Sequence, residues 1–206
     1  QIQMIIDLFP TSVYMDSFEL SPEDHENLSH VKLNRNRDQC AYVSSHIHLL
    51  DWYQSIELKV RKHVEQYVYN DIGLNRGYNM QCHGAWLNRN DKGDYTEIHH
   101  HSNSLISGVY YLSVNDQQGR IQFYDDKDGL FGRYFTVLNY TEPNNRNSHR
   151  ANVECKNGTI LLFPSRLKHS VAPNLSEEPR FSLAFDYTLE GIFDAMVNKV
   201  NYVPVK

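Results

Sequence analysis

The chain has 206 residues, 40% hydrophobic and 22% charged, which fits one soluble globular domain with a sizeable core. Its formal net charge of −5 gives no basic surface for non-specific nucleic-acid binding, and no apolar run approaches the roughly 20 residues of a membrane span. The three cysteines form no CxxC pair, which favours a reducing compartment such as the cytoplasm over a disulfide framework.

The N-terminal part is predicted to contain an edge strand followed by helices. The chain opens Gln-Ile-Gln before Met4, which we expect to be the natural start, with the three preceding residues a cloning remnant. Residues 4–14 predict a short strand at a sheet edge, because the proline within them cannot donate a ladder hydrogen bond. Ser21 begins SPED, a typical N-cap, so a short helix should follow. Apolar residues spaced three and four apart predict a long amphipathic helix over residues 47–70, packed on a sheet.

After Gly77 the sequence changes character. Short segments rich in Val, Ile, Tyr and Phe alternate with turn residues, and they predict strands over residues 80–87, 95–101, 105–114, 120–124, 133–138, 150–154, 159–163, 169–172 and 180–188. This rhythm is typical of a sandwich or barrel. We therefore expect a single, mainly β, α+β domain over residues 1–206, with a helical support at about residues 15–75 and an antiparallel β core at about residues 78–190.

Three consecutive histidines stand in the predicted strand 95–101. Alternate side chains of a strand share a face, so Glu97, His99 and His101 should point one way and His100 the other. Two imidazoles on one rigid strand can reach the same metal ion, and His169, at the start of a later strand, is the candidate third ligand. Glu97 is the alternative third ligand, in place of His101.

Arg180 follows His169 by eleven residues and opens the segment RFSLAFDY. An arginine at the start of an otherwise apolar strand indicates a partly buried cation, which needs a carboxylate partner. By alternation, Ser182 and Ala184 share the face of Arg180.

The order of these residues resembles that of iron(II)/2-oxoglutarate oxygenases, whose fold is a double-stranded β-helix, or jelly roll. The spacing of Asn88, Gly93 and His99 is similar to an Asn…Gly…His run in AlkB-type members. Nearly the whole chain resembles a small family of 2-oxoglutarate oxygenases from phages and marine bacteria, which carries the motifs LFPT, W-x-N, H-x-H, SGVYY and LFPS…HxVxP, here at residues 8–11, 86–88, 99–101, 107–111 and 162–173.

The resemblance implies an iron(II)-dependent dioxygenase of a bacterial or phage-infected host cytoplasm, which uses 2-oxoglutarate and O2. The implied reaction is a hydroxylation coupled to decarboxylation of 2-oxoglutarate to succinate. The implied metal ligands and catalytic residues are His99, His101 and His169. Arg180 is implied to bind the far carboxylate of 2-oxoglutarate, and the other implied cosubstrate contacts are Ser182, Asn88 and Tyr110, with Tyr111 as the alternative to Tyr110.

The sequence departs from the family pattern at the metal site. Most of the superfamily carries Asp or Glu where His101 stands, so the usual two-histidine, one-carboxylate triad becomes a three-histidine triad. Such a site has one more positive charge, which the dianionic cosubstrate should tolerate. Ser102 also replaces a frequent proline, and Asn90 replaces a tyrosine of the AlkB comparison.

Two other functions fit parts of the pattern. A cupin-like three-histidine dioxygenase would use iron without 2-oxoglutarate and would not need Arg180, and a non-catalytic jelly-roll protein could hold a structural metal. No GxSxG elbow or P-loop supports a hydrolase or a nucleotide-binding protein. The sequence does not distinguish a metabolite, a protein side chain or a nucleobase as substrate, nor does it give the oligomeric state.

Overall fold

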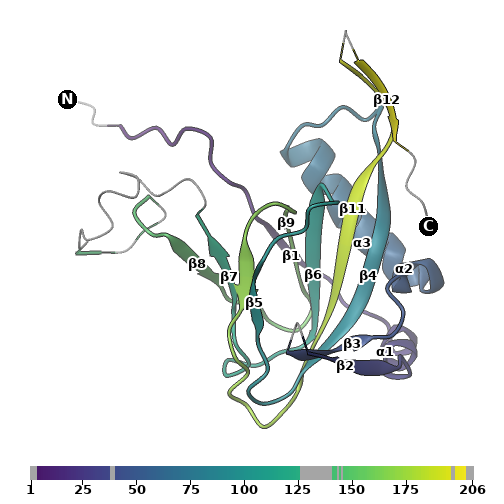
Figure 1. The fold of residues 1–206 in the computed structure, drawn as a ribbon, viewed down its shortest axis with the longest axis vertical. Coiled ribbons are helices and arrows are strands. Elements are labelled where there is room, and N and C mark those ends of the chain that lie inside the picture. The colour runs from purple at the N-terminus through teal and green to yellow at the C-terminus, as the bar shows by residue number, and fades with distance from the viewer. Residues whose placement is uncertain are drawn as a thin grey trace.

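The computed structural model describes residues 4–37, 40–125, 141–142, 144, 146–195 and 198–202. Its helices are α1 (Pro22–Ser29), α2 (Leu49–Trp52), α3 (Gln54–Glu65) and a π-helical turn, η1 (Gln66–Asp71). Its strands, shown in Figure 1, are β1 (Tyr14–Ser17), β2 (Leu33–Asn36), β3 (Ala41–Ser44), β4 (Asn79–Asn90), β5 (Thr96–His99), β6 (Ile106–Ser113), β7 (Ile121–Tyr124), β8 (Arg150–Val153), β9 (Thr159–Pro164), β10 (His169–Val171), β11 (Arg180–Ala195) and β12 (Asn198–Tyr202).

Two antiparallel sheets make up the β core. The larger sheet has the order β1-β9-β6-β11-β4-β3-β2, with β12 paired to β11, and the smaller sheet has the order β5-β10-β7-β8. The sheets face each other, and the helices cover the outer face of the larger one (Figure 1). This arrangement is the jelly roll, and it confirms the mainly β fold expected from the sequence. None of the described helices is long and apolar enough to cross a membrane.

The alternation of side chains divides the larger sheet into two faces with different tasks. On the outer face, Leu183 and Phe185 of β11 join the cluster that contains the buried residues of α3. On the inner face, Leu161 and Phe163 of β9 pack against Phe123 of the smaller sheet. The central strands of the larger sheet are therefore buried on both sides, by the helices on one face and by the smaller sheet on the other.

The two predicted helical segments are present with one change. Ser21 caps α1 through a capping box with Asp24, as its SPED sequence indicates. The predicted long helix is interrupted at Tyr53, whose φ of −110° and ψ of 72° are not helical, so α2 and α3 are separate. Ile56 and Val60 of α3 are fully buried, which confirms that this helix packs on the sheet.

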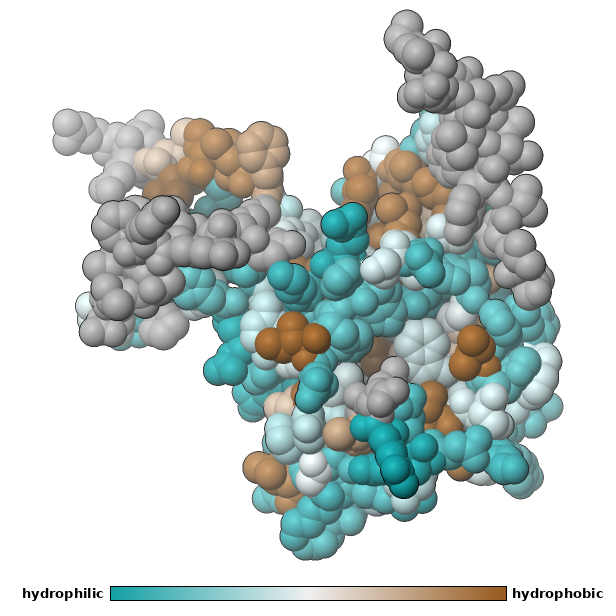
Figure 2. Space-filling view, viewed as in Figure 1, coloured by the Kyte–Doolittle hydropathy of each residue, from teal (hydrophilic) through white to brown (hydrophobic). Residues whose placement is uncertain are grey.

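Two predicted segments differ from the structure. The strand expected over residues 4–14 is absent there, and β1 begins only at Tyr14, because Phe9 at φ +55° followed by Pro10 interrupts an extended chain. The hairpin of β2 and β3 lies in the region expected to be helical. The strand predicted for residues 133–138 lies outside the described residues. Figure 2 shows the N-terminal segment as a hydrophobic projection, in which the exposed side chains are Met4, Ile5, Ile6, Leu8 and Phe9.

Gly108 in β6 gives a testable link between sequence and packing. A Cβ at this position would lie 2.2 Å from the ring of Phe185 and 2.6 Å from the side chain of Leu162. We expect Gly108→Ala to lower the free energy of unfolding by about 1–3 kcal/mol, because the added methyl group would overpack the core. Urea titration of the metal-free protein measures this change.

Gly84→Ala is the matched control, since a Cβ there would meet Trp86 at an ordinary 3.6 Å. Its cost should be small, because alanine also restricts the unfolded chain. Equal losses for the two variants would contradict the packing explanation.

Candidate metal centre

The pairing of β5 with β10 places two of the predicted histidines side by side. His99 and His169 are directly opposite each other in this antiparallel pair, and their ring centroids are 4.2 Å apart. His101 follows β5, and its backbone N–H donates a 2.9 Å hydrogen bond to the carbonyl oxygen of Ser165. This bond holds the segment so that the His101 ring lies 5.3 Å from His99 and 5.4 Å from His169.

All three rings use Nδ1 for a hydrogen bond to the protein. Nδ1 of His99 lies 2.8 Å from the carbonyl oxygen of Glu97, and Nδ1 of His169 lies 2.9 Å from that of Leu167. Nδ1 of His101 lies 2.7 Å from the carboxylate of Asp186. When Nδ1 donates in each ring, Nε2 keeps its lone pair, which is the arrangement that ligating histidines adopt.

Burial favours the neutral form of His99 and His169. It lowers the pKa of His169 to about 3, and the neighbouring His99 acts in the same direction. Burial is also the main cause of the lowered pKa of His99. Only a neutral imidazole can ligate a metal. Burial therefore favours the form of these two rings that a metal requires.

The donor set fits a divalent transition metal. One ligand atom from each of His99, His101 and His169 lies within 4.8 Å of the other two. Metal–imidazole bonds of about 2.1 Å place two cis or tetrahedral donors about 3.0–3.4 Å apart, so the rings would move inward when they bind a metal. Imidazole nitrogens suit iron, zinc, copper and nickel.

Glu97 and His100 lie outside this cluster. Both side chains are exposed, and Nε2 of His100 is 3.3 Å from the hydroxyl of Ser102. Glu97 contributes its backbone carbonyl to His99, and its carboxylate is not among the grouped ligand atoms. Of the two alternative third ligands in the sequence, the structure brings His101 to the cluster.

Arg180 lies inside the same β core and is only 2% exposed. Its Nη1 donates to the carbonyl oxygens of Gln118 and Gly119 at 2.7 and 3.1 Å, and Nη2 donates to Oδ1 of Asn90 at 2.8 Å. Nε has no hydrogen-bond partner, and no carboxylate of the described residues forms an ion pair with this guanidinium. Burial lowers the pKa of Arg180, as expected for a cation without a counter-ion.

The other predicted cosubstrate contacts lie partly beside Arg180. Ser182 is the cross-strand neighbour of both Asn88 in β4 and Tyr111 in β6. Tyr110, the first choice from the sequence, lies on the opposite face, where its hydroxyl donates to the carbonyl oxygen of Phe18. The prediction that Tyr110 contacts the cosubstrate is therefore wrong. Tyr111, the alternative, is the tyrosine that lies between the two sheets.

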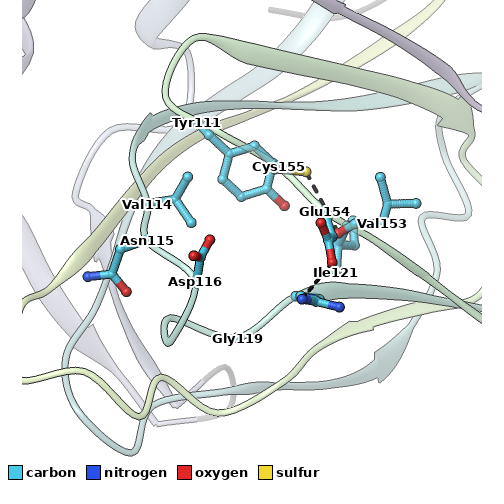
Figure 3. Close-up of a pocket in the computed structure, with 10 residues that line it drawn as sticks. Tyr111, Val114, Asn115, Asp116, Gly119, Ile121, Val153, Glu154 and Cys155 are labelled. Atoms are coloured by element: carbon cyan, nitrogen blue, oxygen red, sulfur yellow. Dashed lines mark hydrogen bonds and ion pairs between the residues drawn. The ribbon is translucent and has the colours of Figure 1, made fainter.

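Figure 3 shows Tyr111 with its hydroxyl beside Cys155 at a small pocket. Burial raises the pKa of Tyr111, so its phenol stays protonated and can donate a hydrogen bond. The pocket measures about 20 Å³, which is room for about one water molecule and not for a dicarboxylic acid. At this pocket the Tyr111 hydroxyl can therefore donate a hydrogen bond to a water molecule but not to a dicarboxylic acid.

Two residues beside His101 were not identified from the sequence. Asp186 contacts Nδ1, and Trp86 stacks at a ring-centroid distance of 5.9 Å and an interplanar angle of 16°. The signal for Asp186 was present, because the alternation that joins Arg180, Ser182 and Ala184 continues to Asp186. Trp86 was noted only as part of a motif.

Comparison with known proteins gives the family. A family model described as "Putative 2OG-Fe(II) oxygenase" matches residues 84–186, half of the chain. This span contains His99, His101, His169 and Arg180. No curated protein sequence matches the chain.

Solved structures share the fold at low identity. An oxidoreductase of the 2OG-Fe(II) oxygenase family from Burkholderia pseudomallei is 12% identical, with a TM-score of 0.61 over 85% of this chain and 84% of that one. HygX from Streptomyces hygroscopicus, with nickel and 2-oxoglutarate bound, is 13% identical, with a TM-score of 0.61 over 86% and 83%. A prolyl-4-hydroxylase from Pseudomonas putida is 14% identical, with a TM-score of 0.51 over 86% and 92%. With the family model spanning its β core, this chain belongs to the 2OG-Fe(II) oxygenases, a family of oxidoreductases.

Proposed function

We propose that the protein is an iron(II)- and 2-oxoglutarate-dependent dioxygenase that hydroxylates its substrate. The observation that carries the proposal is one interior that contains both halves of the required site. Three imidazole donors lie within 4.8 Å of one another, and a buried arginine that pairs with no carboxylate of the described residues lies on the same face of β11 as the residue that contacts His101.

His99, His101 and His169 would hold the iron. Three protein ligands on one side leave positions open for a bidentate keto acid and for oxygen, in the manner of the facial triad. When bound, iron(II) would supply the oxidative decarboxylation of 2-oxoglutarate by O2, in which one oxygen atom enters succinate, carbon dioxide leaves, and the other oxygen atom becomes the hydroxyl group on the substrate carbon. The hydrogen bonds at Nδ1 keep the three rings oriented and their Nε2 atoms free of protons.

Arg180 would bind the far carboxylate of 2-oxoglutarate. A buried guanidinium is costly unless an anion neutralises it, and its planar donors match a carboxylate. Asn90 and the carbonyl oxygens of Gln118 and Gly119 fix the guanidinium while Nε remains available. Ser182 would add a hydroxyl donor from the next position of β11 that shares the face of Arg180.

The cupin-like alternative without 2-oxoglutarate is less well supported. It accounts for the three histidines but gives no reason for Arg180 to be only 2% exposed with no carboxylate of the described chain paired to it. A structural metal is likewise less well supported, because such sites are closed by a fourth protein ligand. Among the described residues, the group of candidate ligands contains only the three histidines.

Metal affinity tests the histidines. We expect alanine at position 99, 101 or 169 to weaken cobalt(II) binding by more than the roughly 10–100-fold that loss of an outer partner costs, because a direct ligand is removed. Isothermal titration of the apoprotein with cobalt chloride measures the dissociation constant.

His100→Ala is the matched control, because this neighbouring ring is exposed and its Nε2 lies 3.3 Å from the hydroxyl of Ser102, outside the histidine cluster. It should bind cobalt as the wild type does. A wild type that binds no cobalt, or a His100→Ala variant as impaired as His169→Ala, would contradict the assigned ligands.

Cosubstrate affinity tests Arg180. In the anaerobic iron(II) protein, we expect Arg180→Met to weaken 2-oxoglutarate binding by about 10–100-fold, since a charge-assisted hydrogen bond is worth about 1.5–3 kcal/mol. The charge-transfer absorption that 2-oxoglutarate develops on iron(II) gives the dissociation constant, and metal affinity should not change.

Arg120→Met is the control, because Arg120 forms a surface ion pair with Glu154. It should leave 2-oxoglutarate binding intact. If the wild-type iron protein ignores 2-oxoglutarate, the cupin-like alternative replaces the proposal.

A further inference from the structure

Asp186 is a buried carboxylate aimed at a metal ligand. It is 7% exposed and lies on the inner face of β11. Its Oδ2 lies 2.7 Å from Nδ1 of His101, and its Oδ1 accepts a 2.6 Å hydrogen bond from the hydroxyl of Ser107. The Ser107 hydroxyl is in turn 2.9 Å from that of Ser165, whose backbone carbonyl holds the N–H of His101. Asp186 and His101 are thus fixed to each other through both side chains and backbone.

The carboxylate of Asp186 pairs with His101 and with no other cationic side chain of the described residues. Among the described residues, no lysine or arginine forms an ion pair with it, and its one ion-pair contact is His101. Ser107 supplies a neutral hydroxyl only. Buried charges in proteins are paired or coordinate metals. The charge of Asp186 would therefore be balanced, through His101, by a cation that His101 binds.

The three histidines differ in this respect. His99 and His169 place Nδ1 against neutral backbone carbonyls at 2.8 and 2.9 Å, whereas His101 faces a carboxylate at 2.7 Å. His101 also occupies the position at which most of the superfamily carries an acidic ligand. The additional carboxylate therefore stands behind the one ligand that replaces a carboxylate.

We infer that Asp186 is a positioning residue that returns to the metal site, through His101, the negative charge that an acidic ligand supplies in the two-histidine, one-carboxylate triad. The inference rests on the proposed use of His99, His101 and His169 as ligands. The carboxylate holds the proton of His101 at Nδ1 and makes the imidazole a more basic donor at Nε2. With Asp186 counted, the site loses the additional positive charge of a three-histidine triad.

The first test removes the charge and keeps the shape. Asp186→Asn retains an oxygen that can accept from Nδ1 of His101, so the ring stays oriented. We expect cobalt(II) affinity, measured by titration of the apoprotein, to fall about 10–100-fold, the usual cost of losing an outer-shell partner. Asp94→Asn is the control, because Asp94 is also a buried carboxylate but pairs with Arg35. It should leave cobalt affinity unchanged.

The second test separates charge from structure. In a His101→Asp background the ligand itself is a carboxylate, and Asp186 becomes a like-charged neighbour. Asp186→Asn should then leave cobalt affinity unchanged or raise it, the opposite of its effect beside His101. An equal loss in both backgrounds, or no loss in the wild-type background, overturns the inference.

A measurement on the unmodified protein covers the case in which Asp186→Asn does not fold. In the zinc-loaded protein, a proton–nitrogen-15 correlation spectrum of the imidazoles gives the chemical shift of each Nδ1 proton. The Nδ1 proton of His101 should lie further downfield than those of His99 and His169, because charge-assisted hydrogen bonds are shorter and stronger. Three similar Nδ1 protons would overturn the inference. A wild type that binds neither cobalt nor zinc would instead overturn the proposed function.

Discussion

The antiparallel pairing of β5 with β10 is the constraint on which the centre depends. Because His99 and His169 are opposite each other in this ladder, their side chains emerge on one face with ring centroids 4.2 Å apart. The strand ends also supply the carbonyl oxygens, at Glu97 and Leu167, that satisfy Nδ1 of each ring. Desolvation of these two imidazoles would be unfavourable without the two bonds. The centre is thus built into the backbone of the smaller sheet.

The larger sheet supplies the rest of the site from one face of one strand. Arg180, Ser182 and Asp186 occupy alternate positions of β11 and face the interior. Leu183 and Phe185 face the helices and carry much of the packing. The polar residues of the proposed site and the apolar packing residues therefore occupy opposite faces of β11.

The sequence predicted most of this architecture because strand alternation and metal-ligand chemistry are local rules. The histidine cluster required only that residues 99 and 101 share a face and that one distant histidine join them. The sequence does not show which tyrosine faces the smaller sheet, because β6 is buried on both faces and Tyr110 and Tyr111 are the same residue type. Alternation along β11 places Asp186 on the face of Arg180, but it does not show that His101 of another strand segment lies beside it. The β2–β3 hairpin is short and largely polar, so its pairing is set by tertiary contacts and not by propensity.

The regularity of β11 has a consequence for how the gene can vary. Where its pairing shifts register, the additional residue lies in a neighbour, at Leu112 of β6 and at His83 of β4, and never in β11 itself. One codon gained or lost between Arg180 and Asp186 would turn one of them from the interior to the helical side. Insertions and deletions should therefore accumulate in the adjoining strands and loops, while this seven-codon stretch keeps a fixed length.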